Sequence, residues 1–557
     1  MESLCFGCFN DELLDKKESS NITYTQLNKL NKVNKSVVYL SFLLVGVLIR
    51  LISLKTKGME DVDVMINWGL SILNLGWDKG YLAIYFPTSH LIFNFIVELS
   101  TYLSIEIFQL FATIRLISDI LFLFLLIILN KLGFISRLMV VLIWLNPLLL
   151  VLTLSGYTDT FSLTLILLSL VFLVLYQKRK KYYLIILCGF SLALFLFLKP
   201  QTLLLLIFLF FFIFVFVITQ KGYENFIEKI FFLSSLMLPS LILFGLYSVI
   251  LSSPTKLSCG DAIGPRTISS LEQIAQTEWN VCIDPLQISM TYPKSGPTVC
   301  MENKLKAYSP LGEAGFCVKN YEFSQPLTVN DYWETGYKKL MGQILNGSVE
   351  HMPSYSANMP NFWHIYVVNF LNYDQEREVW SYKASENFNK NVWYSILLFV
   401  FAYSSFLLWL FRKRIKTPFD LISLIGFPVT FIIPIFSTLA HENHLALGIF
   451  FSYLLINLRL FNSRFIKLLH FLMIIISSFL ALNISRLYLW PMWGESNSKL
   501  LSIIGNNFLD FFLYPNIYQI ALLTTIAATI ILLVVPLGTY VYNFFATKKT
   551  YKHNYNS

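Results

Sequence analysis

Acidic and aromatic residues follow the first apolar stretch closely, in a pattern that could support acid–base chemistry. Asp61 and Asp63 lie in the segment Glu60-Asp61-Val62-Asp63, and Trp68 and Tyr85 follow with apolar residues between them. Trp and Tyr favour membrane–water interfaces, and a carboxylate held beside them in a cavity can accept a proton. The alternative interpretation is a solvated loop with incidental acids.

Two further polar groups interrupt apolar segments. Asp159 ends the segment Ser155-Gly156-Tyr157-Thr158-Asp159, where a helix cap is the simplest explanation. Lys199-Pro200-Gln201 places a cation and an amide at a point where proline must break a helix. The alternative for Lys199 is a side chain that extends along apolar surface to the membrane boundary.

The segment His441-Glu442-Asn443-His444 also lies between apolar stretches. Charged and imidazole groups at membrane depth usually line a cavity or a substrate path, because their burial is costly. The two histidines are three residues apart, whereas the metalloprotease motif places them four apart, so the pattern is poor support for a metal site. Arg115 and Asp119, four residues apart in another apolar run, are expected to neutralise each other in a structural role.

The composition indicates where these groups lie. Of the 557 residues, 56% are hydrophobic and 13% are charged, and that charged share is about half of the soluble-domain average. A soluble protein could not keep such an apolar surface in water. We therefore expect an all-α polytopic membrane protein, and the composition disfavours a soluble enzyme, a secreted domain and a nucleic-acid binder.

Apolar runs of about 17 to 23 residues predict membrane-spanning helices. They lie near 37–54, 138–153, 160–176, 182–198, 203–219, 230–252, 392–411, 418–437, 445–460, 464–483 and 519–543. The apolar stretch 88–130 is expected to cross once, with residues 88–105 at the interface or re-entrant. The sequence thus predicts about twelve crossings.

Basic clusters set the expected orientation, because Lys and Arg gather in cytoplasmic loops. They occur near residues 29–35, 131–137, 178–181, 412–416, 459–467 and 548–552. The alternate loops then face outward, namely residues 55–87, 154–159, 199–202, 253–391, 438–444 and 484–518. The expected parts are a cytoplasmic N-terminal segment (1–36), a transmembrane module (37–252) with a catalytic first outer loop (55–87), an outward-facing loop domain (253–391), a second transmembrane module (392–543) and a cytoplasmic tail (544–557).

The loop domain 253–391 differs in composition from the rest of the chain. It holds 11 basic and 14 acidic residues, a net charge of −3, so the positive excess lies elsewhere. Its four cysteines, Cys259, Cys282, Cys300 and Cys317, are even in number, which in an outward loop predicts two disulfides with the pairing left open. Four free thiols are the alternative. Cys188 is expected in the membrane core.

One substrate class would explain the outward polar groups: a lipid-linked phosphosugar. Its phosphate needs cationic donors, for which Lys199, His441 and His444 are the candidates. Its acceptor hydroxyl needs a carboxylate that takes the proton during attack on the anomeric carbon, for which Asp61 and Asp63 are the candidates. Asp159 is expected to line the same cavity and to hold the acceptor or a divalent cation, Mn²⁺ or Mg²⁺. A polyprenyl tail would explain a site that opens into the membrane.

This arrangement resembles the GT-C fold of membrane glycosyltransferases, whose outward loops carry an acidic motif followed by an acid and basic residues. The seven-residue spacing from Asp61 to Trp68 is similar to that in dolichyl-phosphate-glucose-dependent glucosyltransferases and in bacterial relatives of the second mannosyltransferase of GPI assembly. This resemblance favours Asp61 over Asp63 as the base. Lys199-Pro200-Gln201 resembles the Lys-Pro-Gln of the bacterial group.

Two later segments extend the resemblance. Asn358-Met359-Pro360-Asn361-Phe362-Trp363 is similar to the Asn-Ala-x-Asn-Leu-Trp or Ala-Asn-Phe-Trp segments of these families, which implies substrate contacts for Asn361 and Trp363. His441-Glu442-Asn443-His444 resembles His-Glu-Arg-Tyr or His-Glu-Lys, but Asn443 replaces the basic residue, so a phosphate contact would pass to His444. Phe86-Pro87-Thr88 has one proline where these families often have two.

The resemblance implies an inverting transferase that moves a hexose, mannose being favoured, from a polyprenyl or dolichyl phosphate to a glycan, glycolipid or protein acceptor. The site would face the outer or lumenal side of a bacterial inner membrane or an endoplasmic reticulum membrane, with membrane lipids but no nucleic acid as partners. The alternatives are a glucosyltransferase of the same fold and a lipid-sugar transporter or flippase. The expected catalytic residues are Asp61, Asp63 and Asp159, and the expected substrate-binding residues are Lys199, Gln201, His441, Glu442, His444, Asn361, Trp363, Trp68 and Tyr85.

Overall fold

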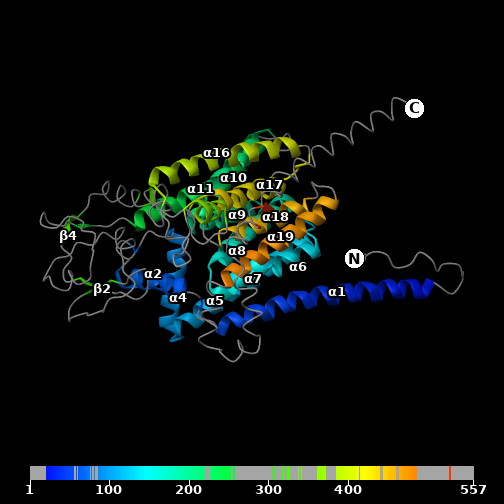
Figure 1. The fold of residues 1–557 in the computed structure, drawn as a ribbon, viewed down its shortest axis with the longest axis horizontal. Coiled ribbons are helices and arrows are strands. Elements are labelled where there is room, and N and C mark those ends of the chain that lie inside the picture. Colours follow the sequence, from blue (N-terminus) through cyan, green and yellow to red (C-terminus); the bar gives the residue numbers. More distant parts are fainter. Residues whose placement is uncertain are drawn as a thin grey trace.

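Helices lie side by side in a bundle in the computed structural model (Figure 1). The structure describes residues 21–55, 58, 60–75, 77, 81, 86–219, 226–251, 255–257, 305–307, 316–318, 323–326, 337, 340–341, 361–371, 384–412, 414–438, 443–458, 463–485, 523 and 526–527.

The first part of the chain forms a continuous series of helices. These are α1 (Asn21–Leu51), the 3-10 turn η1 (Ile52–Lys55), α2 (Glu60–Leu75), α4 (Pro87–Leu103), α5 (Ile107–Lys131), α6 (Arg137–Trp144), α7 (Pro147–Ser155), α8 (Asp159–Arg179), α9 (Tyr182–Leu196), α10 (Pro200–Thr219) and α11 (Phe226–Ile250). The later helices are α15 (Phe362–Phe370), α16 (Glu386–Phe411), α17 (Pro418–Phe436), α18 (Leu445–Asn457) and α19 (Ser463–Ile484).

Two short antiparallel ladders lie within the expected loop domain 253–391. Strand β1 (Thr255–Leu257) pairs with β4 (Phe323–Pro326), and β2 (Leu305–Ala307) pairs with β3 (Phe316–Val318). These strands were not predicted, because the segments are too short to show an alternating pattern. They add a small β component to a chain that was expected to be all-α.

The length and composition of the helices confirm the expectation of a membrane protein. Within the described residues, seven helices are long and apolar enough to cross a membrane, or eight if the bent pair α6 and α7 forms one span. Peripheral helices expose large apolar side chains, for example Leu241 of α11 and Leu398 of α16, which are 65% and 71% exposed. Such surfaces need lipid around them. The chain is therefore a polytopic α-helical membrane protein, while the predicted number of twelve crossings stays a prediction.

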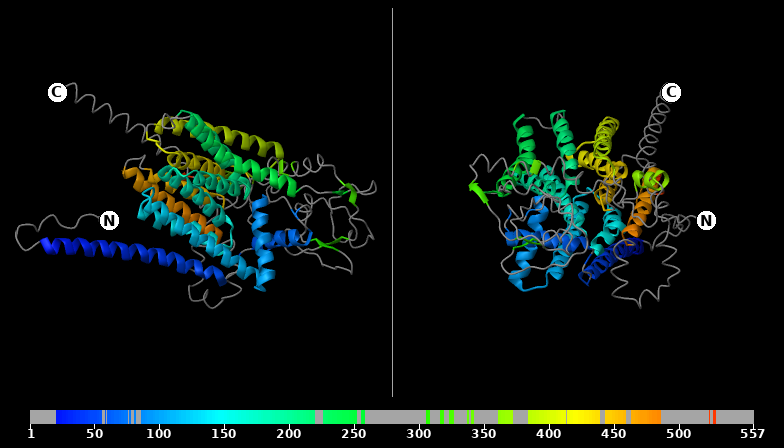
Figure 2. Two further views of the ribbon diagram at one scale, coloured as in Figure 1. Left: turned by 180° about the vertical axis from the view of Figure 1, so that it is seen from behind. Right: turned by 60° about the vertical axis from the view of Figure 1, so that its left-hand side comes forward.

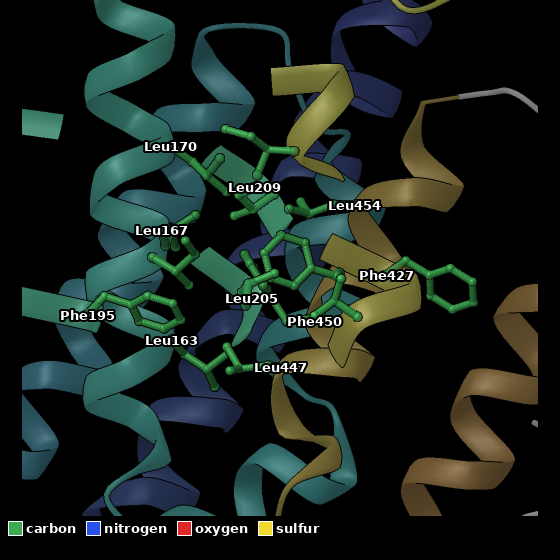
Figure 3. Packing of buried hydrophobic residues seen from close by; sticks show 14 of the residues in the cluster. Leu163, Leu167, Leu170, Phe195, Leu205, Leu209, Phe427, Leu447, Phe450 and Leu454 are labelled. Atoms are coloured by element: carbon green, nitrogen blue, oxygen red, sulfur yellow. The ribbon is translucent and has the colours of Figure 1, made fainter. Parts of the chain in front are cut away.

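The helices differ in how much of their surface other protein segments cover. In α17, 89% of the most apolar window is buried, whereas in Ser36–Lys55 the share is 22%. Leucine and phenylalanine side chains of α8, α10 and α18 meet beside α17 in the largest core cluster (Figure 3). Cys188 is buried in the same cluster, as predicted. The bundle thus has a protein-packed centre and a rim of helices suited to contact with lipid.

Helix caps divide two of the predicted apolar stretches into separate helices. The apolar stretch 88–130 is divided at Ser104, which ends α4 with a left-handed φ of 52°, and Glu106 then caps α5 by accepting a hydrogen bond from the Gln109 amide at 2.7 Å. The segment 138–153 was expected to be one spanning helix; it is divided into α6 and α7, which together are long and apolar enough for one span. Asn146 caps a new helix with Pro147 as its first residue, which bends the segment by 40°.

The two ends of the bundle differ in composition. Basic residues collect where α5, α8 and α16 end and where α6, α9 and α17 begin; this basic end contains Lys131, Arg137, Lys178–Lys181, Arg412, Arg414 and Lys416. The Lys178 ammonium there donates to the Leu132 carbonyl at 2.6 Å. At the opposite end, α4 stands across the direction of the long helices and α2 lies beside it (Figure 2). We call this opposite end the α4 end.

The tight packing of α9 on α11 makes a stability prediction. A Cβ atom added to Gly189 would overlap the carbonyl oxygen of Ser235 and lie 3.0 Å from Cγ of Pro239. Gly189→Ala should therefore separate the two helices and destabilise the protein by about 1–3 kcal/mol. Thermal unfolding in nanodiscs should show a lower midpoint. Leu187→Ala, on the exposed face of the same helix, is the control, and an equal loss from it would contradict this packing.

Candidate functional site at the alpha4 end

Three polar side chains from distant parts of the chain meet at the α4 end. The Lys199 ammonium lies 3.1 Å from Oδ2 of Asp159, and the Asn443 amide donates to the same oxygen at 2.8 Å. The exposed fractions of Lys199, Asp159 and Asn443 are 4%, 6% and 3%. The structure therefore brings together one residue from each of three polar segments that were singled out in the sequence.

Local sequence explains how each group reaches this position. Gly156 has a φ of 92° and ends α7, so the chain can turn and begin α8 at Asp159. Lys199 stands between α9 and α10 because Pro200, the first residue of α10, cannot continue a helix. The Thr202 hydroxyl secures this break by bonding the Leu196 carbonyl at 3.0 Å.

The start of α4 is fastened to the same break. The Thr88 amide donates to the Phe197 carbonyl at 2.9 Å, and the Ser89 hydroxyl donates to the Leu198 carbonyl at 2.6 Å. The Thr88 hydroxyl also shares a hydrogen bond of 3.0 Å with the Tyr247 hydroxyl of α11. The single-proline segment at residues 86–88 therefore holds the backbone immediately before Lys199.

The first turn of α2 packs against the turn that carries Asp159. A Cβ atom on Gly156 would lie 3.2 Å from Cα of Gly58 and 2.7 Å from Cγ2 of Val62. Asp61 belongs to this turn of α2, and its side chain lies outside the described residues; Asp63 is half-buried. The backbone of the predicted acidic loop therefore adjoins the cluster of Asp159, Lys199 and Asn443.

A second buried ionic cluster joins α1, α5 and α7. Asp119 of α5 pairs with Arg50 of α1 at 3.4 Å and accepts a hydrogen bond from the Thr153 hydroxyl at 2.8 Å. Arg50 also lies over the ring of Trp144, 3.5 Å from its centroid. Asp119 was expected to pair with Arg115, but no ion pair of 4.0 Å or less joins them in the described structure, because Asp119 faces Arg50 instead. Arg50 was missed because its partner lies 69 residues away in sequence.

The predicted substrate residue Trp68 packs against a histidine that sequence reasoning missed. The Trp68 and His90 rings are stacked with centroids 5.1 Å apart, and Tyr81 covers His90 at 4.6 Å. His90 is fully buried, and its Nε2 has no hydrogen-bond partner within the described structure. Burial lowers the pKa of His90 to about 3, so the ring is neutral. A histidine inside an apolar run was the signal that could have revealed it.

Asn361 and Trp363 are engaged with the end of α17. The Asn361 amide donates to the Ser437 carbonyl at 2.9 Å, and its oxygen caps α15 through the His364 amide. The Trp363 indole donates to the Phe436 carbonyl at 2.5 Å. These contacts fix the start of α15 against the C-terminal end of α17.

The remaining predicted residues have a limited description. His444 is half-buried just before α18, Gln201 belongs to the first turn of α10 with its side chain outside the described residues, and Cys317 lies on β3. The predicted residues Tyr85, His441, Glu442, Cys259, Cys282 and Cys300 lie outside the described residues.

Asp159 has the donors of a positioned carboxylate. Within the described part of the chain, no three His, Cys, Asp or Glu side chains gather as a metal site would require. Oδ2 of Asp159 instead accepts hydrogen bonds from the Lys199 ammonium and the Asn443 amide. The arrangement can hold a cation and a carboxylate in fixed geometry next to the acidic turn of α2.

No protein-family model, curated protein or solved structure matches this chain.

The buried pair of Asp159 and Lys199 makes a prediction about coupling. Asp159→Leu removes the carboxylate that faces the Lys199 ammonium, so the variant should lose about 3–5 kcal/mol of stability. Lys199→Met added to Asp159→Leu should restore most of the loss, because an apolar pair replaces the ionic one. Thermal unfolding of the two single variants and the double variant measures this coupling. Additive losses in the double variant would contradict it.

The buried neutral His90 makes a prediction about pH. The pKa of His90 is lowered from 6.5 to about 3 in the folded protein. As pH falls, the imidazole is therefore protonated in the unfolded chain before it is protonated in the folded protein. This contribution to stability is present above pH 6.5 and declines below it by about 1.4 kcal/mol per unit. His90→Phe should therefore flatten the loss of thermal stability between pH 7 and pH 5. His553→Phe is the control, and parallel pH profiles for the His90 variant and the wild type would refute the assignment.

Proposed function

We propose that this chain is an inverting glycosyltransferase of the GT-C type that transfers a hexose, mannose being favoured, from a polyprenyl or dolichyl phosphate. The acceptor would be a glycan, glycolipid or protein at the outer or lumenal face of its membrane. The single observation that carries the proposal is the meeting of Asp159, Lys199 and Asn443 beside the acidic turn of α2. The reaction needs both a carboxylate and a cation in one place.

The distribution of charge supports the proposed orientation. Lys131, Arg137, Lys178, Arg412 and Lys416 lie at the basic end, opposite the candidate site. Lys and Arg are enriched in cytoplasmic loops, so the basic end is proposed to face the cytoplasm. The α4 end then faces the compartment in which lipid-linked sugars are used after they have crossed the membrane.

The proposed reaction is a single displacement that uses a carboxylate and a cation. The acceptor oxygen attacks the anomeric carbon as Asp61 takes its proton. The bond from that carbon to the phosphate oxygen breaks, and its electron pair leaves with the lipid phosphate. Lys199 stabilises the charge that grows on this phosphate, while Asp159 and Asn443 hold the lysine in place. Attack on the face opposite the leaving group inverts the anomeric centre.

Two other functions fit parts of the same observations. A glucosyltransferase of the same fold would use the same residues with a different sugar pocket. A lipid-sugar flippase would also bury charges, but transporters place their binding groups near the membrane midplane between repeated halves. The grouping of Asp159, Lys199 and Asn443 at helix ends on one side of the bundle favours a transferase.

The assignment of Asp61 as base makes a kinetic prediction. Asp61→Asn should lower hexose transfer by about 100-fold or more, because the amide cannot take the acceptor proton. The donor should still bind. Purified protein incubated with labelled polyprenyl-phosphate mannose and, separately, glucose, followed by chromatography of the products, measures the effect.

Asp63→Asn is the matched control for the same turn, and we expect a milder loss from it. Wild-type activity in the Asp61 variant would remove Asp61 from the mechanism. Absence of transfer from both sugars by the wild-type protein, together with movement of the lipid-sugar across vesicles, would favour the flippase.

A further inference from the structure

Arg115 of α5 is a buried cation that forms no ion pair of 4.0 Å or less with the described side chains. Its exposed fraction is 0%, and its three guanidinium nitrogens have no hydrogen-bond partner within the described structure. The Phe111 ring is its aromatic neighbour, 5.4 Å from Cζ to the centroid. A guanidinium carries five N–H donors and stays protonated in proteins, so its burial without acceptors is strongly unfavourable.

The neighbouring carboxylate does not balance this charge. Asp119 faces Arg50 and accepts from Thr153, so Arg50, Asp119 and Arg115 together carry two positive charges and one negative charge. Buried charges are normally paired or bound to a ligand. Among these three described side chains, positive charge therefore exceeds negative charge by one.

The position of Arg115 indicates where an anion would enter. A Cβ atom on Gly156 would lie 3.0 Å from Nη1 of Arg115 and 2.7 Å from Cγ2 of Val62. The guanidinium therefore lies directly beneath the contact between the first turn of α2 and the turn that leads into Asp159. This is also the side of the bundle on which Lys199 is held.

We infer that Arg115 binds the phosphate of the lipid donor, as a second cationic group below Lys199. This inference rests on the proposed function. A phosphate diester offers two charged oxygens that match the planar fork of a guanidinium. Val62 of α2 and the Arg115 guanidinium both lie beside Gly156, so the inference requires the first turn of α2 to move away from Gly156 when the phosphate binds.

Stability and binding together test the assignment, because they should change in opposite directions. Arg115→Gln leaves Arg50 and Asp119 as a neutral pair, so without ligand its thermal midpoint should equal or exceed that of the wild type. Its affinity for polyprenyl phosphate should fall by about 10- to 100-fold. Arg50→Gln is the matched control: it breaks the observed ion pair, so it should lower the midpoint and keep the ligand-dependent shift.

The experiment measures thermal shifts of the full-length protein in nanodiscs with polyprenyl phosphate, with polyprenol of the same length and with inorganic phosphate. A shift with polyprenyl phosphate but not with polyprenol supports recognition of the phosphate. An additional shift with inorganic phosphate would show that the tail is dispensable, and its absence would show that the tail is needed. In either case the shift must weaken in Arg115→Gln.

Equal ligand affinity in Arg115→Gln and the wild type would overturn the inference, and so would a midpoint lowered as much as in Arg50→Gln. Hexose transfer by the wild type, measured separately, distinguishes failure of the role given to Arg115 from failure of the proposed function. If transfer persists while Arg115→Gln binds normally, the role of Arg115 is wrong and the proposed function stands. If the wild type neither transfers sugar nor binds polyprenyl phosphate, both fail.

Discussion

The buried contact of Lys199 with Asp159 determines how the α4 end is organised. The Lys199 side chain is only 4% exposed, so its positive charge needs a carboxylate partner. That partner is Asp159, the first residue of α8. Asn443 shares the same oxygen, so the entry to α18 is fixed by the same pair. These bonds connect three helix junctions that would otherwise be joined by apolar contacts, and apolar contacts specify position less sharply than directional bonds between charges.

The membrane explains why these junctions carry the polar groups. Helix interiors in lipid satisfy their own backbone, so irregular chain is tolerated where other protein covers it. The break at Gly156 is covered by the first turn of α2. The break at Lys199 is covered by α4, where the Ser89 hydroxyl donates a hydrogen bond to the Leu198 carbonyl. The elements that cover the breaks are thus also the elements that bring Asp61 and Asp63 to the same end of the bundle.

Much of this arrangement could be predicted from sequence, because hydropathy and charge act locally. Apolar runs predicted the positions of the helices, and basic residues such as Lys131 and Lys178 predicted which helix ends lie together at the basic end of the bundle. The bend at Asn146 and the pairing of Asp119 with Arg50 could not be predicted. The first depends on a cap within a continuous apolar run, and the second joins helices that are far apart in sequence. His90 was missed because its aromatic partners are brought together by the fold and not by spacing.

The stereochemistry of the transferred sugar tests the central claim most directly. Wild-type protein would be incubated with labelled polyprenyl-phosphate mannose and a membrane extract that supplies acceptors, and the anomeric configuration of the product would be determined by NMR. Direct attack by the acceptor, with Asp61 as base and Lys199 at the leaving phosphate, predicts a product of the anomeric configuration opposite to that of the donor. Retention of configuration, or recovery of the donor without transfer, would contradict this account.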